Sequence, residues 1–167
     1  MQLPPYIVFK PYSLEYLEWA QEQLGGDEML VEFRHASWLD DENRRETLAF
    51  LESHHMTYVI VDAPRSGARN VSPTVVAAPT PTAYVRLHGR NAETRNNRTG
   101  SAAERFDYLY SDDELAEWVP PLHELAEGAE QAYAFFNNTS VTSGVAQAPA
   151  GAELLRRLLQ ESGVPTA

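Results

Sequence analysis

The stretch "YVRLHGRN", residues 84–91, decides which fold the sequence predicts. It begins like a buried strand, with apolar Val85 and Leu87, and interleaves them with Arg86, His88 and then Arg90. Side chains two positions apart in a strand point to the same face, so Arg86 and His88 share one side and the two apolar residues share the other. A buried strand that turns polar at its end predicts a barrel strand whose tip faces a ligand.

Three other strands are expected to end in the same way. They are "MLVEFRH" (29–35), "TYVIVDAP" (57–64) and "AYAFFNN" (132–138). The polar residues at the four strand ends are Glu32, Arg34 and His35; Asp62; Arg86 and His88; and Asn137 and Asn138. The carboxyl ends of parallel strands share one face of an α/β protein, and that face carries the ligand site. The pattern favours a shared site over a set of unrelated structural pairs.

Amphipathic helices are expected before, between and after these strands. They run from Ser13, as N-cap, to Gly25–Gly26; from about residue 40 to 54; from the capping box "SDDE" (111–114) to Ala126, interrupted at Pro120–Pro121; and through Leu154–Leu159 to Gly163. Strands that alternate with helices predict parallel pairing through helical crossovers, which is an α/β fold. With 167 residues, 43% of them hydrophobic, we expect one domain over residues 1–167.

Composition restricts location and partners. The chain has no cysteine, which suits a reducing compartment, and neither a signal peptide nor an apolar run long enough to cross a membrane is evident. We therefore expect a cytoplasmic protein with no membrane partner. Its 24 acidic and 13 basic residues give a net charge of -11, which repels nucleic-acid phosphates and makes nucleic acid a disfavoured partner. The chain contains a single lysine, Lys10, and either adaptation to high salt or a GC-rich genome would explain this scarcity.

Several motifs together resemble a known family. They are "QLPP", "VEFRHASW", "VDAP", "YVRLHGRN", "YLYSDDELAEW", "FFNNT" and "GVAQAPAGAELLRRLL". In this order, and over nearly the whole chain, they resemble the C-terminal part of the YecE-like proteins, domain of unknown function family 72. The resemblance implies a TIM-barrel-like fold and no particular activity, because the family's biochemical role is not established.

The resemblance also implies missing strands. Family members carry further strands before "QLPP", and a TIM barrel takes about 250 residues. We expect an incomplete barrel of roughly the last four to five strands, from a truncated gene or a misplaced start, whose open sheet edges promote self-association. Thr139 and Gly151 stand where many members have histidine and asparagine, so no role is carried over to these two positions.

The predicted catalytic residues are His88, Glu32 and Asp62. Histidine moves protons near neutral pH, and a carboxylate can orient or oppose it. Glu32 and Arg34 point to the same side of their strand, where an internal ion pair is the structural alternative. A metal held by Glu32, His35, Asp62 and His88 is disfavoured because no tight ligand spacing is present, so we predict no metal, and the cofactor is unknown.

The predicted ligand-binding residues are Arg34, His35, Trp38, Arg86, Gly89, Arg90, Asn137 and Asn138. Arginine suits carboxylate or phosphate, asparagine suits hydroxyl groups, and tryptophan can cover a ring. Each has a structural alternative: a tight turn for Gly89, a solvated loop for Arg90 with Arg95 and Arg98, a strand-end cap for the asparagines and packing for Trp38. His54 and His55 are expected to be structural.

Two functions remain open from the sequence. The first is an enzyme of hydrolase, lyase or isomerase type acting on a small anionic or polyhydroxylated molecule. The second is a binding barrel without turnover, for which nucleic acid bound through the arginine-rich loop is one candidate partner. The sequence has no GxSxG elbow, no phosphate-binding glycine loop and no dinucleotide fingerprint, which removes the chemistries that depend on them.

Overall fold

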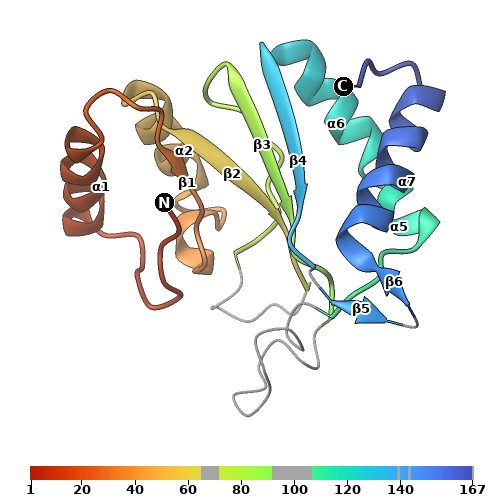
Figure 1. The fold of residues 1–167 in the computed structure, drawn as a ribbon. Helices are drawn as coiled ribbons and strands as arrows, with labels where there is room; N and C mark the ends of the chain where they lie inside the picture. The colour runs from red at the N-terminus through yellow and green to blue at the C-terminus, as the bar shows by residue number, and fades with distance from the viewer. Residues whose placement is uncertain (65–71, 92–106, 139, 143, 167) are drawn as a thin grey trace.

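A four-stranded parallel sheet forms the centre of the computed structural model, which describes residues 1–64, 72–91, 107–138, 140–142 and 144–166 (Figure 1). Its strands are β1 (Leu30–Val31), β2 (Thr57–Asp62), β3 (Thr82–Leu87) and β4 (Gln131–Phe136), in that spatial order. A single parallel bridge between Gln2 and Glu32 extends the sheet beyond β1. The predicted α/β fold with parallel strands is confirmed.

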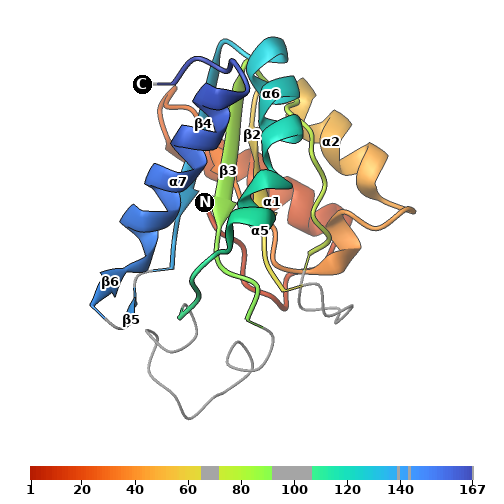
Figure 2. The ribbon, with the colours of Figure 1, turned by 90° about the vertical axis from the view of Figure 1, so that its right-hand side faces the viewer.

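One helix precedes the four strands, and the others lie between and after them. They are α1 (Pro11–Gln23), the short 3-10 helix η1 (Ala36–Trp38), α2 (Arg44–Ser53), α5 (Asp112–Ala116), α6 (Val119–Gly128) and α7 (Gln147–Glu161). The small hairpin of β5 (Val141–Thr142) and β6 (Val145–Ala146) was not predicted. In Figure 1 the hairpin lies beyond the end at which β4 finishes, and Figure 2 shows α7 alongside β4.

Helix ends follow from local chemistry, with one correction. Ser111 and Glu114 form the predicted capping box, and the two prolines occupy the first turn of α6, where they need no backbone N–H. Ser13 was predicted to cap the first helix, but Lys10 holds that position and Pro11 starts the helix. The Ser13 hydroxyl is buried and donates to the carbonyl of Val8 at 2.9 Å, which satisfies it without capping.

The two faces of the sheet have different surroundings. One face packs on the helices through residues such as Tyr58, Ile60, Val85 and Leu87. The other, which we call the inner face, carries Leu30, Val59, Val61, Tyr84, Arg86, Tyr133 and Phe135. The hydrophobic cluster on it contains strand residues and Ala63 but no residue of a described helix. Side chains on the inner face are therefore free to line a site.

The strands differ in burial according to their place in the sheet. Every residue of β2 is buried, as expected of a central parallel strand. In β4 all residues but Phe136 are exposed, because the sheet ends there. Within the described ranges no helix is both long and apolar enough to span a membrane.

Candidate functional site

Glu32 is the centre of a buried polar cluster at the carboxyl ends of the strands. It follows β1, and its side chain is 1% exposed. One carboxylate oxygen, Oε1, lies 3.2 Å from Arg34 Nη1 and 3.2 Å from His88 Nε2, and the other, Oε2, accepts a hydrogen bond from Arg86 Nη1. One carboxylate thus faces three basic side chains.

Sheet register explains how residues far apart in sequence meet here. Val61 pairs with Arg86, and Arg86 pairs with Phe135, so these side chains share the inner face. The long arginine reaches across β2 to Glu32 on one side, while its Nη2 donates to Asn137 Oδ1 at 3.0 Å on the other. The hydrogen bonds of Arg86 therefore join the ends of β1 and β4.

The protonation states of the central pair follow from burial and charge. Burial alone would raise the pKa of Glu32, but the hydrogen bond from His88 and the nearby positive charges lower it to about 2. Burial lowers the pKa of His88, and the charges of Arg86 and Arg34 lower it further, against the opposing effect of Glu32. Glu32 is ionised and His88 neutral at pH 7, and Nε2 of His88 carries the proton because a carboxylate only accepts.

A cavity of about 310 Å³ opens beside this cluster on the inner face. It is lined by Met1, Gln2, Leu30, Glu32, Val59, Tyr84, Arg86, Phe135, Phe136 and Asn137. Glu32, Arg86 and Asn137 make one part of its wall polar, and the rings of Tyr84 and Phe135 stack at 4.9 Å between centroids in the rest. A volume near the lower end of small-molecule sites, with few polar groups in an apolar wall, suits a small ligand.

The cluster carries more positive than negative charge. Two guanidinium groups face one carboxylate while His88 is neutral, in a protein whose net charge is -11. In addition, Nε of Arg34 is buried and has no hydrogen-bond partner among the described residues. A buried guanidinium N–H without an acceptor is costly. Arg34 does not itself line the cavity, where the guanidinium group present is that of Arg86.

Asp62 lies on the opposite face of the sheet from this cluster. It pairs in register with Leu87, so its carboxylate points toward the helices. There it accepts from Arg90 Nε at 3.1 and 3.0 Å and from the Tyr110 hydroxyl at 2.7 Å. The backbone carbonyl of Asp62 accepts from the N–H of His88 at 3.0 Å, but the structure does not bring its carboxylate to the side chains of His88 and Glu32, with which it was predicted to act.

Arg90 and Gly89 belong to the same network as Asp62. Arg90 Nη1 donates to Glu117 at 2.9 Å, and the hydroxyl of Tyr110 accepts from the backbone N–H of Gly89 at 2.8 Å. Gly89 has a φ of +88°, and a Cβ there would lie 2.5 Å from Cβ of Tyr108. These contacts give both Arg90 and Gly89 a structural role in the network around Asp62. Arg95, Arg98 and Thr139 lie outside the described residues.

Three further predicted ligand-binding residues have structural partners. The Nδ1 of His35 accepts from the backbone of Ser37 at 3.1 Å and so caps η1. Trp38 is fully buried, stacks on Phe33 at 4.4 Å and donates from Nε1 to Ile7, so it does not cover the cavity. Asn138 is buried and donates to the carbonyl of Tyr108 at 2.7 Å.

The donor set gives little support for a metal. Among the described residues no three His, Cys, Asp or Glu side chains are grouped to hold one, and of the four candidate ligand residues only the side chains of Glu32 and His88 meet. The sequence patterns did not lead to a prediction of the cavity wall formed by Leu30, Tyr84 and Phe135. Their positions two residues before Glu32, Arg86 and Asn137 place them on the same face, which is a signal that the sequence does contain.

Solved structures share this fold. A DUF72 family protein of Thermotoga maritima is 36% identical, with a TM-score of 0.81 over 95% of this chain and 56% of its own. A DUF72 family protein of Enterococcus faecalis, 22% identical, has a TM-score of 0.84 over 95% of this chain and 57% of its own, and shows the fold alone.

Sequence comparison agrees with the structural one. The UPF0759 protein YunF of Bacillus subtilis is 30% identical over 142 residues, which are 83% of this chain and 50% of that protein. The chain thus spans about half the length of the relatives that it matches. The expectation that the chain corresponds to the C-terminal part of the family's proteins is not borne out by these matches. The family model described as "Protein of unknown function DUF72" matches residues 1–166, and the chain belongs to that family.

Proposed function

We propose that the chain binds a small anionic molecule in the cavity beside Glu32, Arg86 and Asn137. The observation that carries this proposal is the charge of the buried cluster: two guanidinium groups face a single carboxylate, and one of them, that of Arg86, lines the cavity. A carboxylate or phosphate group would complete the charge balance, since arginine binds both with charge-assisted hydrogen bonds.

The rest of the cavity suggests the body of the ligand. Asn137 and Glu32 offer an amide and a carboxylate to hydroxyl groups, while Tyr84 and Phe135 offer ring faces and edges. A polyhydroxylated ring with one anionic substituent, such as a sugar phosphate or sugar acid, combines these features. The volume of about 310 Å³ limits the ligand to roughly one ring.

A second candidate function is catalysis at the same cavity by a hydrolase, lyase or isomerase. The hydrogen bond between His88 and Glu32 favours it, because such a pair can hold and pass a proton. Glu32 lines the cavity and would contact the substrate, whereas His88 is buried behind it and would act through Glu32. The nucleic-acid alternative has less support, since Arg90 is already held by Asp62 and Glu117.

The domain extent and the barrel-like arrangement of the strands belong to the same proposal. We place residues 1–167 in one domain that forms part of a TIM-barrel-like sheet, with the cavity at the carboxyl ends of its strands. The parallel order β1-β2-β3-β4 and the likeness to the Thermotoga maritima structure support this description.

Isothermal titration with inorganic phosphate, citrate and glucose 6-phosphate tests ligand binding. We expect Arg86→Gln to weaken the binding of the tightest of the three about tenfold or more, because a hydrogen bond to a charged group contributes about 1.5–3 kcal/mol. Arg44→Gln, at an exposed arginine of α2 that pairs with exposed Asp41, is the control and should bind like the unaltered protein. Equal affinity in the Arg86 and Arg44 variants, or binding of none of the three anions, would contradict the proposal.

A further inference from the structure

Ser37 and His35 form a hydrogen-bonded pair in the loop after β1. The Oγ of Ser37 lies 2.9 Å from Nδ1 of His35, and the backbone N–H of Ser37 donates to the same nitrogen at 3.1 Å. A ring nitrogen that accepts from a backbone N–H carries no proton, so the hydroxyl is the donor in the shorter contact. A serine hydroxyl that donates to a histidine nitrogen has the arrangement of a nucleophile with its general base.

Three further hydrogen bonds hold this serine in place. The backbone N–H of Phe9, in the loop before α1, donates to Ser37 Oγ at 2.9 Å. Asn43 Nδ2 donates to the backbone carbonyl of Ser37 at 2.9 Å. Trp38 Nε1 donates to the carbonyl of Ile7 at 2.9 Å and so joins the two loops. The orientation of the hydroxyl is therefore fixed, and the N–H of Phe9 stabilises the negative charge that develops on Oγ when its proton leaves.

The pair lines a cavity of about 740 Å³ at the carboxyl end of the sheet. The other residues that line it are Val8, Phe9, Lys10, Pro11, Ala36, Asp40, Glu42 and Asn43. Its two loops follow the bridge of Gln2 with Glu32 and the end of β1. The cavity shares no lining residue with the one beside Glu32 and Arg86. Ser37 and His35 are both half-buried, and the volume is that of a small-molecule site.

A second serine beside a histidine lacks this arrangement. Ser53 Oγ lies 3.1 Å from Nδ1 of His54, but that nitrogen also lies 2.8 Å from the carbonyl oxygen of Phe50. A carbonyl oxygen only accepts, so Nδ1 of His54 carries a proton and cannot take one from Ser53. Ser53 is also exposed at the end of α2. It provides a matched control for Ser37.

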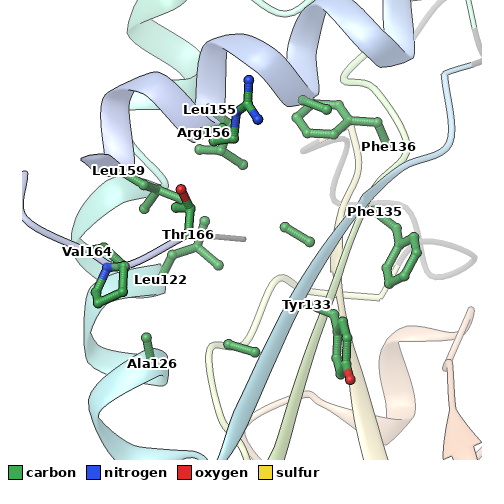
Figure 3. A pocket seen from close by; sticks show the side chains of 14 residues that line it. Leu122, Ala126, Tyr133, Phe135, Phe136, Leu155, Arg156, Leu159, Val164 and Thr166 are labelled. Atoms are coloured by element: carbon green, nitrogen blue, oxygen red, sulfur yellow. The ribbon is translucent and has the colours of Figure 1, made fainter. Parts of the chain in front are cut away.

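The groove between β4 and α7 also lacks a nucleophile with a base. Its volume is about 310 Å³, and Leu122, Leu155 and Leu159 border it from α6 and α7 (Figure 3). Among the described residues that line it there is no histidine, aspartate or glutamate, so the hydroxyl groups of Tyr133 and Thr166 have no general base in its wall. Of these two cavities, the one at Ser37 is the candidate for chemistry.

We propose that Ser37 and His35 hydrolyse small carboxylic esters in this cavity, independently of the anion site beside Glu32. Nδ1 of His35 takes the hydroxyl proton as Ser37 Oγ bonds to the ester carbonyl carbon, whose π electron pair moves to the carbonyl oxygen. When that pair returns, the bond to the alcohol oxygen breaks, and the leaving alcohol takes the proton from His35. Water then attacks the acyl-serine in the same way, which releases the carboxylic acid and returns the proton to Ser37.

The cavity lining indicates the charge of the ester. Asp40 and Glu42 contribute two carboxylates and Lys10 one ammonium group, in a protein whose net charge is -11. This balance repels esters that carry a negative charge. Val8 and Pro11 add apolar surface to the lining. The substrate class that fits is therefore an uncharged ester with small apolar groups.

Hydrolysis of p-nitrophenyl acetate by the 167-residue chain tests the proposal, with peptide mass spectrometry after acid quenching. We expect release of p-nitrophenol and an acetyl group on Ser37. Ser37→Ala should lose both, whereas Ser53→Ala should behave like the unaltered protein. Acetyl groups confined to Lys10 and the N-terminus would contradict the proposal, because these amines react with the ester without help from the pair. Release by Ser37→Ala at the unaltered rate would contradict it as well.

A substitution at His35 separates proton transfer from helix capping. His35→Asn keeps a side-chain acceptor for the backbone N–H of Ser37, so the loop should retain its conformation. The substitution removes the base, and we expect acetylation of Ser37 to slow about a hundredfold or more. If Ser37 is acetylated equally fast in His35→Asn and in the unaltered protein, His35 only caps η1 and the proposal is wrong.

Ser37→Cys guards against a folding effect of Ser37→Ala. The chain has no cysteine, so the thiol at position 37 would be the only one, and it would lie beside the same base. We expect this thiol to be acetylated, because a thiolate is a strong nucleophile. Circular dichroism shows whether each variant keeps its helices and strands. A folded Ser37→Cys variant that remains unacetylated would overturn the proposal.

Discussion

One carboxylate, that of Glu32, holds three basic side chains that come from the ends of β1 and β3. It is buried, and Arg34, Arg86 and His88 all approach it within hydrogen-bonding distance. Removing one partner of a buried ion pair costs more than the pair contributes, because the remaining charge is left buried without compensation. The stability of this end of the sheet therefore depends on Glu32 more than on any one of its partners.

Glu32→Gln should lower the free energy of unfolding by about 3 kcal/mol, because it leaves two guanidinium groups without their counter-charge. Urea denaturation at pH 7 measures this change. Glu153→Gln, at an exposed residue of α7, is the control and should change stability little. An anion that enters the site should restore part of the loss, so added phosphate should stabilise Glu32→Gln more than the unaltered protein. A change as small as that of Glu153→Gln would contradict the central role of Glu32.

Two pH windows follow from the shifted pKa values. The pKa of His88 is lowered in the folded state from about 6.5, so its contribution is complete above pH 6.5 and declines as the pH falls below that value. The pKa of Glu32 is lowered from 4.5 to about 2, so its contribution declines as the pH falls from 4.5 toward 2. His88→Gln should remove the first decline and keep the second, as measured by urea denaturation from pH 8 to 2.

The exposed His123 provides the control for this measurement. It lies on α6 near Glu127, and His123→Gln should leave the decline below pH 6.5 in place. If His88→Gln retains the same dependence between pH 8 and 5, burial of neutral His88 is not its source.

At the scale of elements, the contact between α7 and β4 depends on a missing side chain. Gly151 lies in the first half of α7, and a Cβ at that position would approach Cε1 of Phe136 to 2.6 Å. The close approach of α7 to the end of β4 therefore requires glycine unless the Phe136 ring moves.

Gly151→Ala should destabilise the protein by about 1–3 kcal/mol, because the ring of Phe136 must shift in a packed environment. Gly128→Ala is the matched control: a Cβ there meets nothing within 4 Å, so the change should be near neutral or slightly stabilising. Thermal unfolding of both variants measures the difference. The double variant with Phe136→Leu should recover part of the loss if the clash is the cause, and equal effects at the two glycines would exclude it.

At the scale of the whole molecule, the net charge of -11 sets a dependence on salt. Like charges on a folded surface repel one another, and the screening length falls from about 10 Å at 0.1 M salt to about 3 Å at 1 M. The midpoint of thermal unfolding should therefore rise as KCl is increased from 0.1 to 1 M. A variant with Glu15, Glu22 and Glu153 changed to lysine should respond less, since it carries less excess charge; a midpoint that falls with KCl in the unaltered protein would contradict this.

The sequence by itself determined the order and type of most elements. Apolar runs ending in polar residues predicted β1 to β4, and the capping box and proline pair predicted the beginning of α5 and the interruption before α6. The alternation of Arg86 with Leu87 also predicted that Arg86 would share a face with other polar strand ends. These features are local, because they depend on periods of two and 3.6 residues and on turn chemistry.

Only the tertiary structure decided which polar residues meet. β2 is buried on both faces, so its sequence does not indicate which side Asp62 takes; the register with β3 places Val61 beside Arg86 and turns Asp62 toward Tyr110 and Arg90. Likewise, the local sequence around Trp38 does not show whether its ring lies at the rim of the site or in the hydrophobic core, where the structure places it. Strand register and packing depend on contacts between residues that are far apart in the sequence. They therefore decide which residues form the site at Glu32, and the local sequence pattern does not.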